Sequence, residues 1–147
     1  MVESHYIWPL IIAALLGTLM GLERSIAGKQ AGMRTYALVS LGSCLFVTEG
    51  TLSSLELSFF SGLNPLQIAA SVVVGIGFIG SGLAAFRGEH AELTTASGIW
   101  VVAGVGMACG FGIYAIAVTA TLLSIIIFSL FARVEHMFRV RFGSVKD

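Results

Sequence analysis

Five long apolar stretches dominate this chain, and each is long enough to cross a lipid bilayer as a helix. A bilayer core about 30 Å thick needs about 20 mostly apolar residues in helical form. Hydrophobic residues make up 56% of the 147 residues and charged residues only 11%, about half the charged share of a typical soluble domain. The sequence therefore predicts an all-α integral membrane protein, and it excludes most soluble enzymes and free nucleic-acid binders. We expect the spans at about residues 6–22, 35–52, 66–86, 94–109 and 113–132.

The basic residues predict how these spans are oriented. Eight Lys and Arg residues balance eight Asp and Glu residues, so the net charge indicates no particular partner. Basic residues collect in short cytoplasmic loops, and five spans with the amino terminus outside put all eight on one side. Four or six spans would split them between the two sides. The carboxyl terminus is then cytoplasmic. The basic residues are Arg24, Lys29, Arg34, Arg87, Arg133, Arg139, Arg141 and Lys146.

The two ends of the chain are expected to differ in role. Residues 1–5 contain no Lys or Arg, and no small-residue cleavage site follows the first apolar stretch, so we expect a span there and not a signal peptide. Residues 1–132 form the expected membrane domain, and residues 133–147 a short basic cytoplasmic tail. The sequence Gly110-Phe111-Gly112 predicts a tight hairpin between the last two spans.

A glycine-rich motif in the third span is similar to a dinucleotide-binding loop. Its GxGxxG pattern is meaningful only in a soluble βαβ unit, and this one lies within an apolar span. We expect close helix packing at Gly75, Gly77, Gly80 and Gly82. A locally unwound helix lining a cavity is the alternative. Further glycines in the fourth span indicate that the third and fourth spans form the packed centre.

Charged residues at the end of the first span form the strongest candidate site. Glu23 needs a cationic partner near the membrane, and adjacent residues on a helix point in different directions. We therefore expect Glu23 to pair with Arg34 or Lys29 and not with Arg24. The cluster Glu23, Arg24 and Arg34 acts either as a structural clamp or as a functional ionic site.

Glu49 is the only acid well inside an expected span. It lies fifteen residues after Arg34, or about 22 Å along a helix, in the outer third of the bilayer. Glu49 either reaches outer-leaflet water or faces the interior as a protonatable or cation-binding group. Thr94 or Thr95 is expected to cap the fourth helix.

The cysteine and histidine residues are not expected to form a metal site. Cys44 and Cys109 lie in different spans without CxxC spacing, which favours a packing role. The three histidines are far apart in the sequence. We expect no metal site, no cofactor and no catalytic residues.

An ordered set of motifs resembles the bacterial MgtC/SapB family. The resemblance runs from about Ile11 to Leu130, and the ordered set is more specific than any one motif. The chain departs from the family pattern at Glu92 and Ser97, where many members have Gly and Ala. The motifs are Gly21-Leu-Glu-Arg24, Lys29, Ala31-Gly-Met-Arg-Thr35, Gly75-Ile-Gly-Phe-Ile-Gly-Ser-Gly82, Leu93-Thr-Thr-Ala96 and Trp100.

The resemblance implies a small multi-pass protein of the bacterial inner membrane with about five spans. Family members are associated with growth in low magnesium, survival inside host cells and, in some cases, restraint of the F-type ATP synthase. Larger members carry a soluble carboxyl-terminal domain, whereas this sequence stops about fifteen residues after the last expected span. Any function of that domain is therefore expected to be missing.

From these features we expect a non-enzymatic protein linked to magnesium or cation homeostasis. It would modulate a membrane partner through its glycine-rich helices and the Glu23, Arg24 and Arg34 cluster. Expected partners are the lipid bilayer, a second copy in a homodimer or small homo-oligomer, and the F-type ATP synthase or another membrane protein, but not nucleic acid. The alternative is an oligomeric channel or transporter for protons or Mg²⁺.

Overall fold

The computed structural model describes residues 3–56, 64–85 and 93–142, and every regular element in these ranges is a helix. Each helix contains a segment long and apolar enough to cross a membrane. The predicted all-α fold with five membrane-spanning helices is therefore confirmed. The expectations for Arg87, Glu92 and Lys146 lie outside the described residues. The helices are α1 (Glu3–Ile26), α2 (Met33–Glu56), α3 (Pro65–Ala85), α4 (Leu93–Gly110) and α5 (Tyr114–Phe142).

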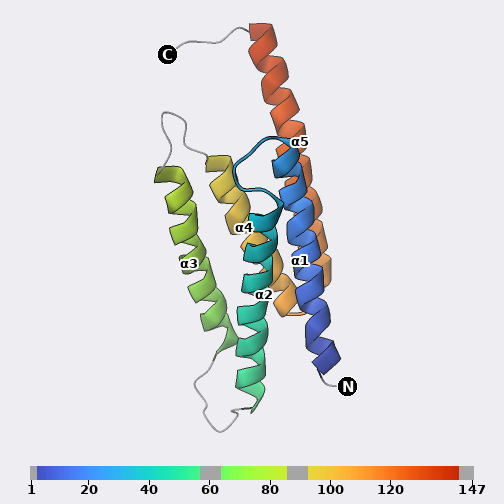
Figure 1. Ribbon diagram of the computed structural model, residues 1–147, viewed down its shortest axis with the longest axis vertical. Helices are drawn as coiled ribbons and strands as arrows, with labels where there is room; N and C mark the ends of the chain where they lie inside the picture. Colours follow the sequence, from blue (N-terminus) through green and yellow to red (C-terminus); the bar gives the residue numbers. More distant parts are fainter. Residues whose placement is uncertain (1–2, 57–63, 86–92, 143–147) are drawn as a thin grey trace.

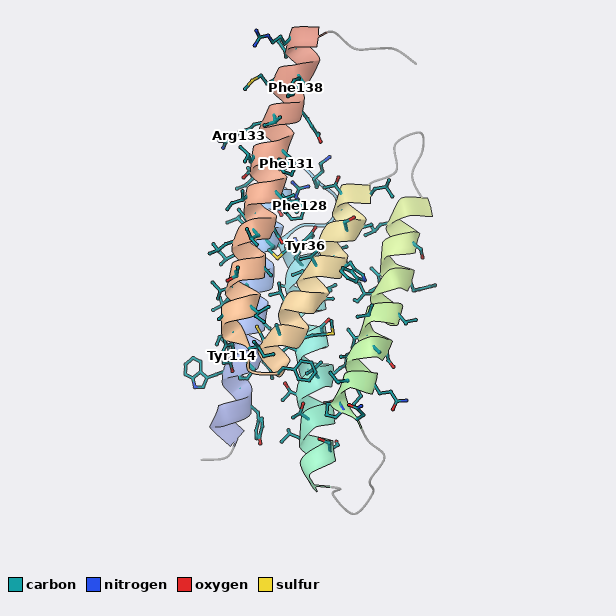
Figure 2. All side chains as sticks on the ribbon, turned by 180° about the vertical axis from the view of Figure 1, so that it is seen from behind. Tyr36, Tyr114, Phe128, Phe131, Arg133 and Phe138 are labelled. Carbon is teal, nitrogen blue, oxygen red and sulfur yellow. The ribbon has the colours of Figure 1, made fainter. Side chains whose placement is uncertain are left out.

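Helix α5 does not end near residue 132, where we placed its boundary, but continues to Phe142. Its sequence contains no Gly or Pro that would stop it. Its 29 residues correspond to about 43 Å of helix, which exceeds the hydrocarbon thickness of about 30 Å. Figure 2 shows Arg133 and Phe138 on the part of α5 that extends past the start of α4. The expected basic tail therefore begins as a continuation of the last span.

Two glycines with positive φ end the first and fourth helices. Gly28 has φ 67° and Gly112 has φ 74°, a conformation that costs little only for glycine. After each glycine the next backbone N–H donates to a carbonyl five residues earlier, Lys29 to Arg24 at 2.9 Å and Ile113 to Ala108 at 2.8 Å. This is the Schellman motif, which satisfies carbonyls left open at a helix end. The predicted hairpin between the last two spans is confirmed.

The helices run alternately up and down, with α4 at the centre of the bundle (Figure 1). Helix α4 contacts each of the other four helices, whereas α3 contacts only α2 and α4 within the described residues. The expectation that the third and fourth spans together form the packed centre is therefore correct only for the fourth. The third lies at the edge of the bundle.

Glycines bring α1 and α4 close to the backbone of α2. A Cβ at Gly17 would lie 2.6 Å from the carbonyl oxygen of Tyr36, and one at Gly110 would lie 2.8 Å from that of Cys44. A Cβ at Gly106 would overlap the carbonyl oxygen of Ser40. Because no side chain larger than hydrogen fits at these positions, α2 is held between two neighbouring backbones.

The glycines of α3 do not make the close contacts we predicted. A Cβ added at Gly75, Gly77 or Gly82 would meet nothing within 4 Å, and one at Gly80 would be 3.8 Å from the Cβ of Ala96, an ordinary contact. The prediction of tight packing at these four positions is thus wrong for contacts within a single copy of the chain. Gly75, Gly77 and Phe78 are instead exposed, whereas Ile76 is buried, because α3 lies at the edge of the bundle.

Candidate functional site

The candidate site is a buried ion pair where α1 ends against α5. The Nε of Arg24 donates to Oε2 of Glu23 at 2.6 Å, and its Nη2 donates to Oε1 at 3.0 Å. The side chain of Arg24 is 4% exposed and that of Glu23 is 19% exposed. Two parallel charge-assisted hydrogen bonds are the strongest geometry available to such a pair.

The expectation that Glu23 pairs with Arg34 or Lys29 is therefore wrong. Adjacent helical side chains leave the backbone in different directions, but the long arginine side chain curves back so that its planar guanidinium reaches the carboxylate of Glu23. Arg34 is exposed and forms no ion pair with Glu23 in the part of the chain that the structure describes. The ion pair that we expected between Glu23 and Arg34 is thus formed by Arg24.

An aromatic ring lies against the ion pair, and a second aromatic side chain lies near the first at Gly98. The guanidinium carbon of Arg24 lies 4.1 Å from the centre of the Phe128 ring on α5, within the range of a cation–π contact. A Cβ at Gly98 on α4 would lie 2.8 Å from the Cζ of Phe128 and would overlap the hydroxyl of Tyr36 from α2. Figure 2 shows Tyr36 and Phe128 close together in height along the bundle. Helices α1, α2, α4 and α5 therefore meet around this cluster.

Tyr36 connects the cluster to the start of α4. It is fully buried, and its hydroxyl donates a long hydrogen bond of 3.5 Å to the carbonyl oxygen of Thr95. Thr94 and Thr95 lie inside the first turn of α4, which begins at Leu93, so neither precedes the helix as the cap we expected. Thr95 is buried and contributes its backbone to the interior.

Glu49 lies on the outer surface of α2. Its side chain is exposed, whereas Val47, Thr48 and Gly50 beside it are buried. The alternative in which Glu49 faces the interior of its own bundle is therefore not what the structure shows. Glu49 is open to lipid, to water or to another protein.

The similarity to known proteins covers most of this chain. The model of the MgtC family matches residues 10–137. The chain belongs to the MgtC family. None of the solved structures matches it.

Three relatives show how widely this MgtC-family sequence is shared. "Putative magnesium transporter YhiD" of Escherichia coli (strain K12) is 39% identical over 132 residues, covering 87% of this chain and 61% of YhiD. "Protein MgtC" of Salmonella typhimurium (strain LT2) is 42% identical over 124 residues, covering 84% of this chain and 51% of MgtC. "Protein SrpB" of Synechococcus elongatus is 33% identical over 138 residues, covering 87% and 75%. The chain thus spans between half and two thirds of YhiD and MgtC.

Sequence reasoning missed three residues of the site in this MgtC-family chain. Phe128 lies against the guanidinium of Arg24, and Tyr36 lies near Phe128 at Gly98. Ser40 has a fully buried hydroxyl with no hydrogen-bond partner among the described atoms. One signal was available, because Tyr36, Ser40 and Cys44 recur every four residues and so share one helix face. No comparable signal identifies Phe128 among the many apolar residues of α5.

The arrangement of these polar residues supports the packing of the bundle. Within the described ranges, no three His, Cys, Asp or Glu side chains gather as metal ligands would. The buried Thr48 and Thr121 hydroxyls donate to carbonyls of their own helices at 2.9 Å. The Arg24 and Glu23 charges neutralise each other. The site therefore brings the end of α1 and the starts of α2 and α4 together with the middle of α5.

Proposed function

We propose that this protein supports magnesium homeostasis from the bacterial inner membrane by binding another membrane protein, without enzymatic chemistry. Its family membership and the name of YhiD link it to magnesium. The resemblance of its motifs to the MgtC/SapB family adds growth in low magnesium and restraint of the F-type ATP synthase in some members. A partner of that kind fits a protein whose helices act as a scaffold.

The observation that carries this proposal is the filled interior of the bundle. Met20, Tyr36 and Ile99, from three different helices, are fully buried at its centre. The charges of Glu23 and Arg24 are paired with each other, and Glu49 lies outside the core. A bundle built in this way favours a role for its outer faces over ion passage through its middle.

Helix α3 supplies the outer face that we assign to the partner. Ile76 is the buried residue of this helix among those described, whereas Val74 and Phe78 are 76% and 82% exposed. Gly75 and Gly77 beside them have open space around them. Small residues allow a neighbouring membrane helix to approach closely. The occupant is a helix of the partner or of a second copy of this chain.

The positions of the basic residues support an orientation of the bundle in the membrane. The described basic residues flank the end of α1, the start of α2 and the end of α5, which lie toward one end of the bundle (Figure 1). By the positive-inside rule we assign this end to the cytoplasm. The amino terminus then lies outside.

Ion transport by an oligomer is the second candidate, and the position of Glu49 favours it. An exposed carboxylate on a membrane helix is costly in lipid, and an interface between copies would remove that cost. The name of YhiD also points to transport of magnesium.

Flux through purified protein in sealed proteoliposomes distinguishes the two candidates. We expect no entry of Mg²⁺ or protons above that of empty liposomes, measured with dyes sensitive to each ion. Glu49→Gln and Glu23→Gln are measured alongside, with Glu135→Gln on the exposed end of α5 as the matched control. If the wild-type protein shows flux that is lost in a well-folded Glu49→Gln variant but kept in Glu135→Gln, ion transport replaces our proposal.

A further inference from the structure

An apolar groove lies between α2 and α3, at the edge of the bundle. It has a volume of about 630 Å³, and its lining residues include Leu38, Gly42 and Phe46 on α2 and Gly75 and Ile79 on α3. Both walls belong to segments that are long and apolar enough to cross a membrane. The groove therefore opens to the membrane interior, where a lipid chain or another membrane helix can enter it.

The two walls of the groove meet at one end and diverge toward the other. A Cβ at Gly50 on α2 would overlap the Cδ1 of Ile68 on α3, so the helices are in contact there. Figure 1 shows that α3 leans away from α2 toward the end at which α2 begins. A Cβ at Gly42 or Gly75 would meet nothing within 4 Å. Small residues in both walls allow a neighbouring membrane helix to approach closely.

A carboxylate lies at the closed end of this groove. Gly42, Phe46 and Glu49 are four and then three residues apart, so they share one face of α2. Glu49 is exposed and forms no ion pair with any residue that the structure describes. It lies five residues before Ser54, the last residue of the membrane-spanning segment of α2, or about 8 Å along the helix. A charge in this position is costly unless it is paired.

The carboxylate of Glu49 decides between the possible occupants of the groove. The chain has no Lys or Arg between Arg34 and Arg87 or between Arg87 and Arg133. The described basic residues lie toward the opposite end of the bundle from Glu49 (Figure 1). Because copies in one membrane share one orientation, a second copy would bring no Lys or Arg to the depth of Glu49. The hydrocarbon chain of a lipid would bring no charge either.

We propose that this groove binds a membrane-spanning helix of a different protein, and that this helix carries a basic side chain that pairs with Glu49. Its apolar face packs against Gly42 and Gly75, and its ammonium or guanidinium group donates hydrogen bonds to the carboxylate. Charges within a membrane are found paired with one another, and polar contacts join membrane helices. The proposal rests on the function proposed above, because it names the chemistry of the partner assumed there.

The test measures binding of synthetic membrane-spanning peptides to the full chain in liposomes by fluorescence energy transfer. The probe is an apolar helix of about 20 Leu and Ala residues with one Lys placed at the depth of Glu49, and the reference peptide has Leu in place of the Lys. We expect the Lys peptide to bind at least tenfold more tightly than the Leu peptide. This preference should disappear in Glu49→Gln and persist in Glu135→Gln, which removes a carboxylate from the exposed end of α5.

A second pair of variants tests the groove itself. Gly42→Leu fills the groove, and we expect it to weaken the binding of both peptides at least tenfold. Gly104→Leu places the same side chain in open space on α4, outside this groove, and we expect it to weaken binding less than threefold. Circular dichroism of each variant shows whether the fold is kept.

Charge reversal tests the pairing directly. We expect Glu49→Lys to prefer a peptide with Glu in place of the Lys and to lose its affinity for the Lys peptide. Equal affinity of the wild-type chain for the Lys and Leu peptides would overturn the proposal, as would a preference that Glu49→Gln leaves unchanged. Absence of binding by both peptides would overturn it as well, because the groove would then hold a lipid chain or a second copy.

The peptide experiment is independent of growth in low magnesium, which tests the proposed function through Gly77→Leu on α3. If that variant fails to grow but neither peptide binds, the proposed function stands and this inference fails. If the variant grows fully while the Lys peptide binds as expected, the groove stands and the proposed function fails.

Discussion

Replacing Arg24 by alanine is expected to destabilise the bundle by about 3 kcal/mol, since breaking a buried ion pair leaves the other charge uncompensated. The variant also loses the contact between the guanidinium and the Phe128 ring, 4.1 Å away. Glu23 would remain largely buried with no partner for its carboxylate. We would measure the free energy of unfolding by titration with a denaturing detergent, followed by circular dichroism.

Two further variants give this prediction its control. Arg34→Ala removes the same charge from an exposed side chain, and we expect its free energy of unfolding to change by no more than about 0.5 kcal/mol. Arg24→Lys keeps the charge but cannot donate two parallel hydrogen bonds or stack as a plane, so an intermediate loss is expected. A loss in Arg24→Ala no larger than that in Arg34→Ala would show that the cluster does not hold the helices together.

Gly106→Ala is the second variant with a large expected effect. Its Cβ would overlap the carbonyl oxygen of Ser40 and lie 2.8 Å from the carbonyl carbon. The obstacle is backbone, so a side-chain rotation cannot relieve it and α2 must move away from α4. We expect a loss of about 2 kcal/mol or more, at the upper end of the cost of overpacking a core.

The control for Gly106→Ala lies two residues away on the same helix. A Cβ at Gly104 would meet nothing within 4 Å, so Gly104→Ala makes the same chemical change in open space. Alanine favours a helix over glycine by up to about 1 kcal/mol, and we expect this variant to be unchanged or slightly more stable. Equal destabilisation in both variants would contradict the close approach of α2 and α4.

Much of the fold could be predicted because membrane helices must satisfy their own backbone hydrogen bonds. The length of each apolar stretch was therefore enough to indicate five helices, and Gly110 and Gly112 were enough to indicate the last turn. The end of α5 could not be placed, since Arg133 and Glu135 suggest a boundary while no Gly or Pro follows between Ala132 and Phe142.

The site was harder to predict because it depends on which helices become neighbours. Arg24 and Arg34 look alike in the sequence, and only the position of α5 makes Arg24 the buried one. The glycines of α3 and α4 also look alike. A Cβ at Gly106 would overlap the backbone of α2, whereas one at Gly77 would meet nothing within 4 Å. This difference arises because α4 is central and α3 lies at the edge.

Growth in low magnesium tests the proposed function most directly. A strain that lacks its own MgtC-family protein would express the wild-type chain, Gly77→Leu on α3, or Ala115→Leu at an exposed position of α5. Gly77 has open space around it, so the leucine leaves the fold intact while blocking the approach of a partner helix. We predict that wild type and Ala115→Leu restore growth and that Gly77→Leu does not. Full growth with Gly77→Leu, at equal protein levels, would contradict a partner on this face.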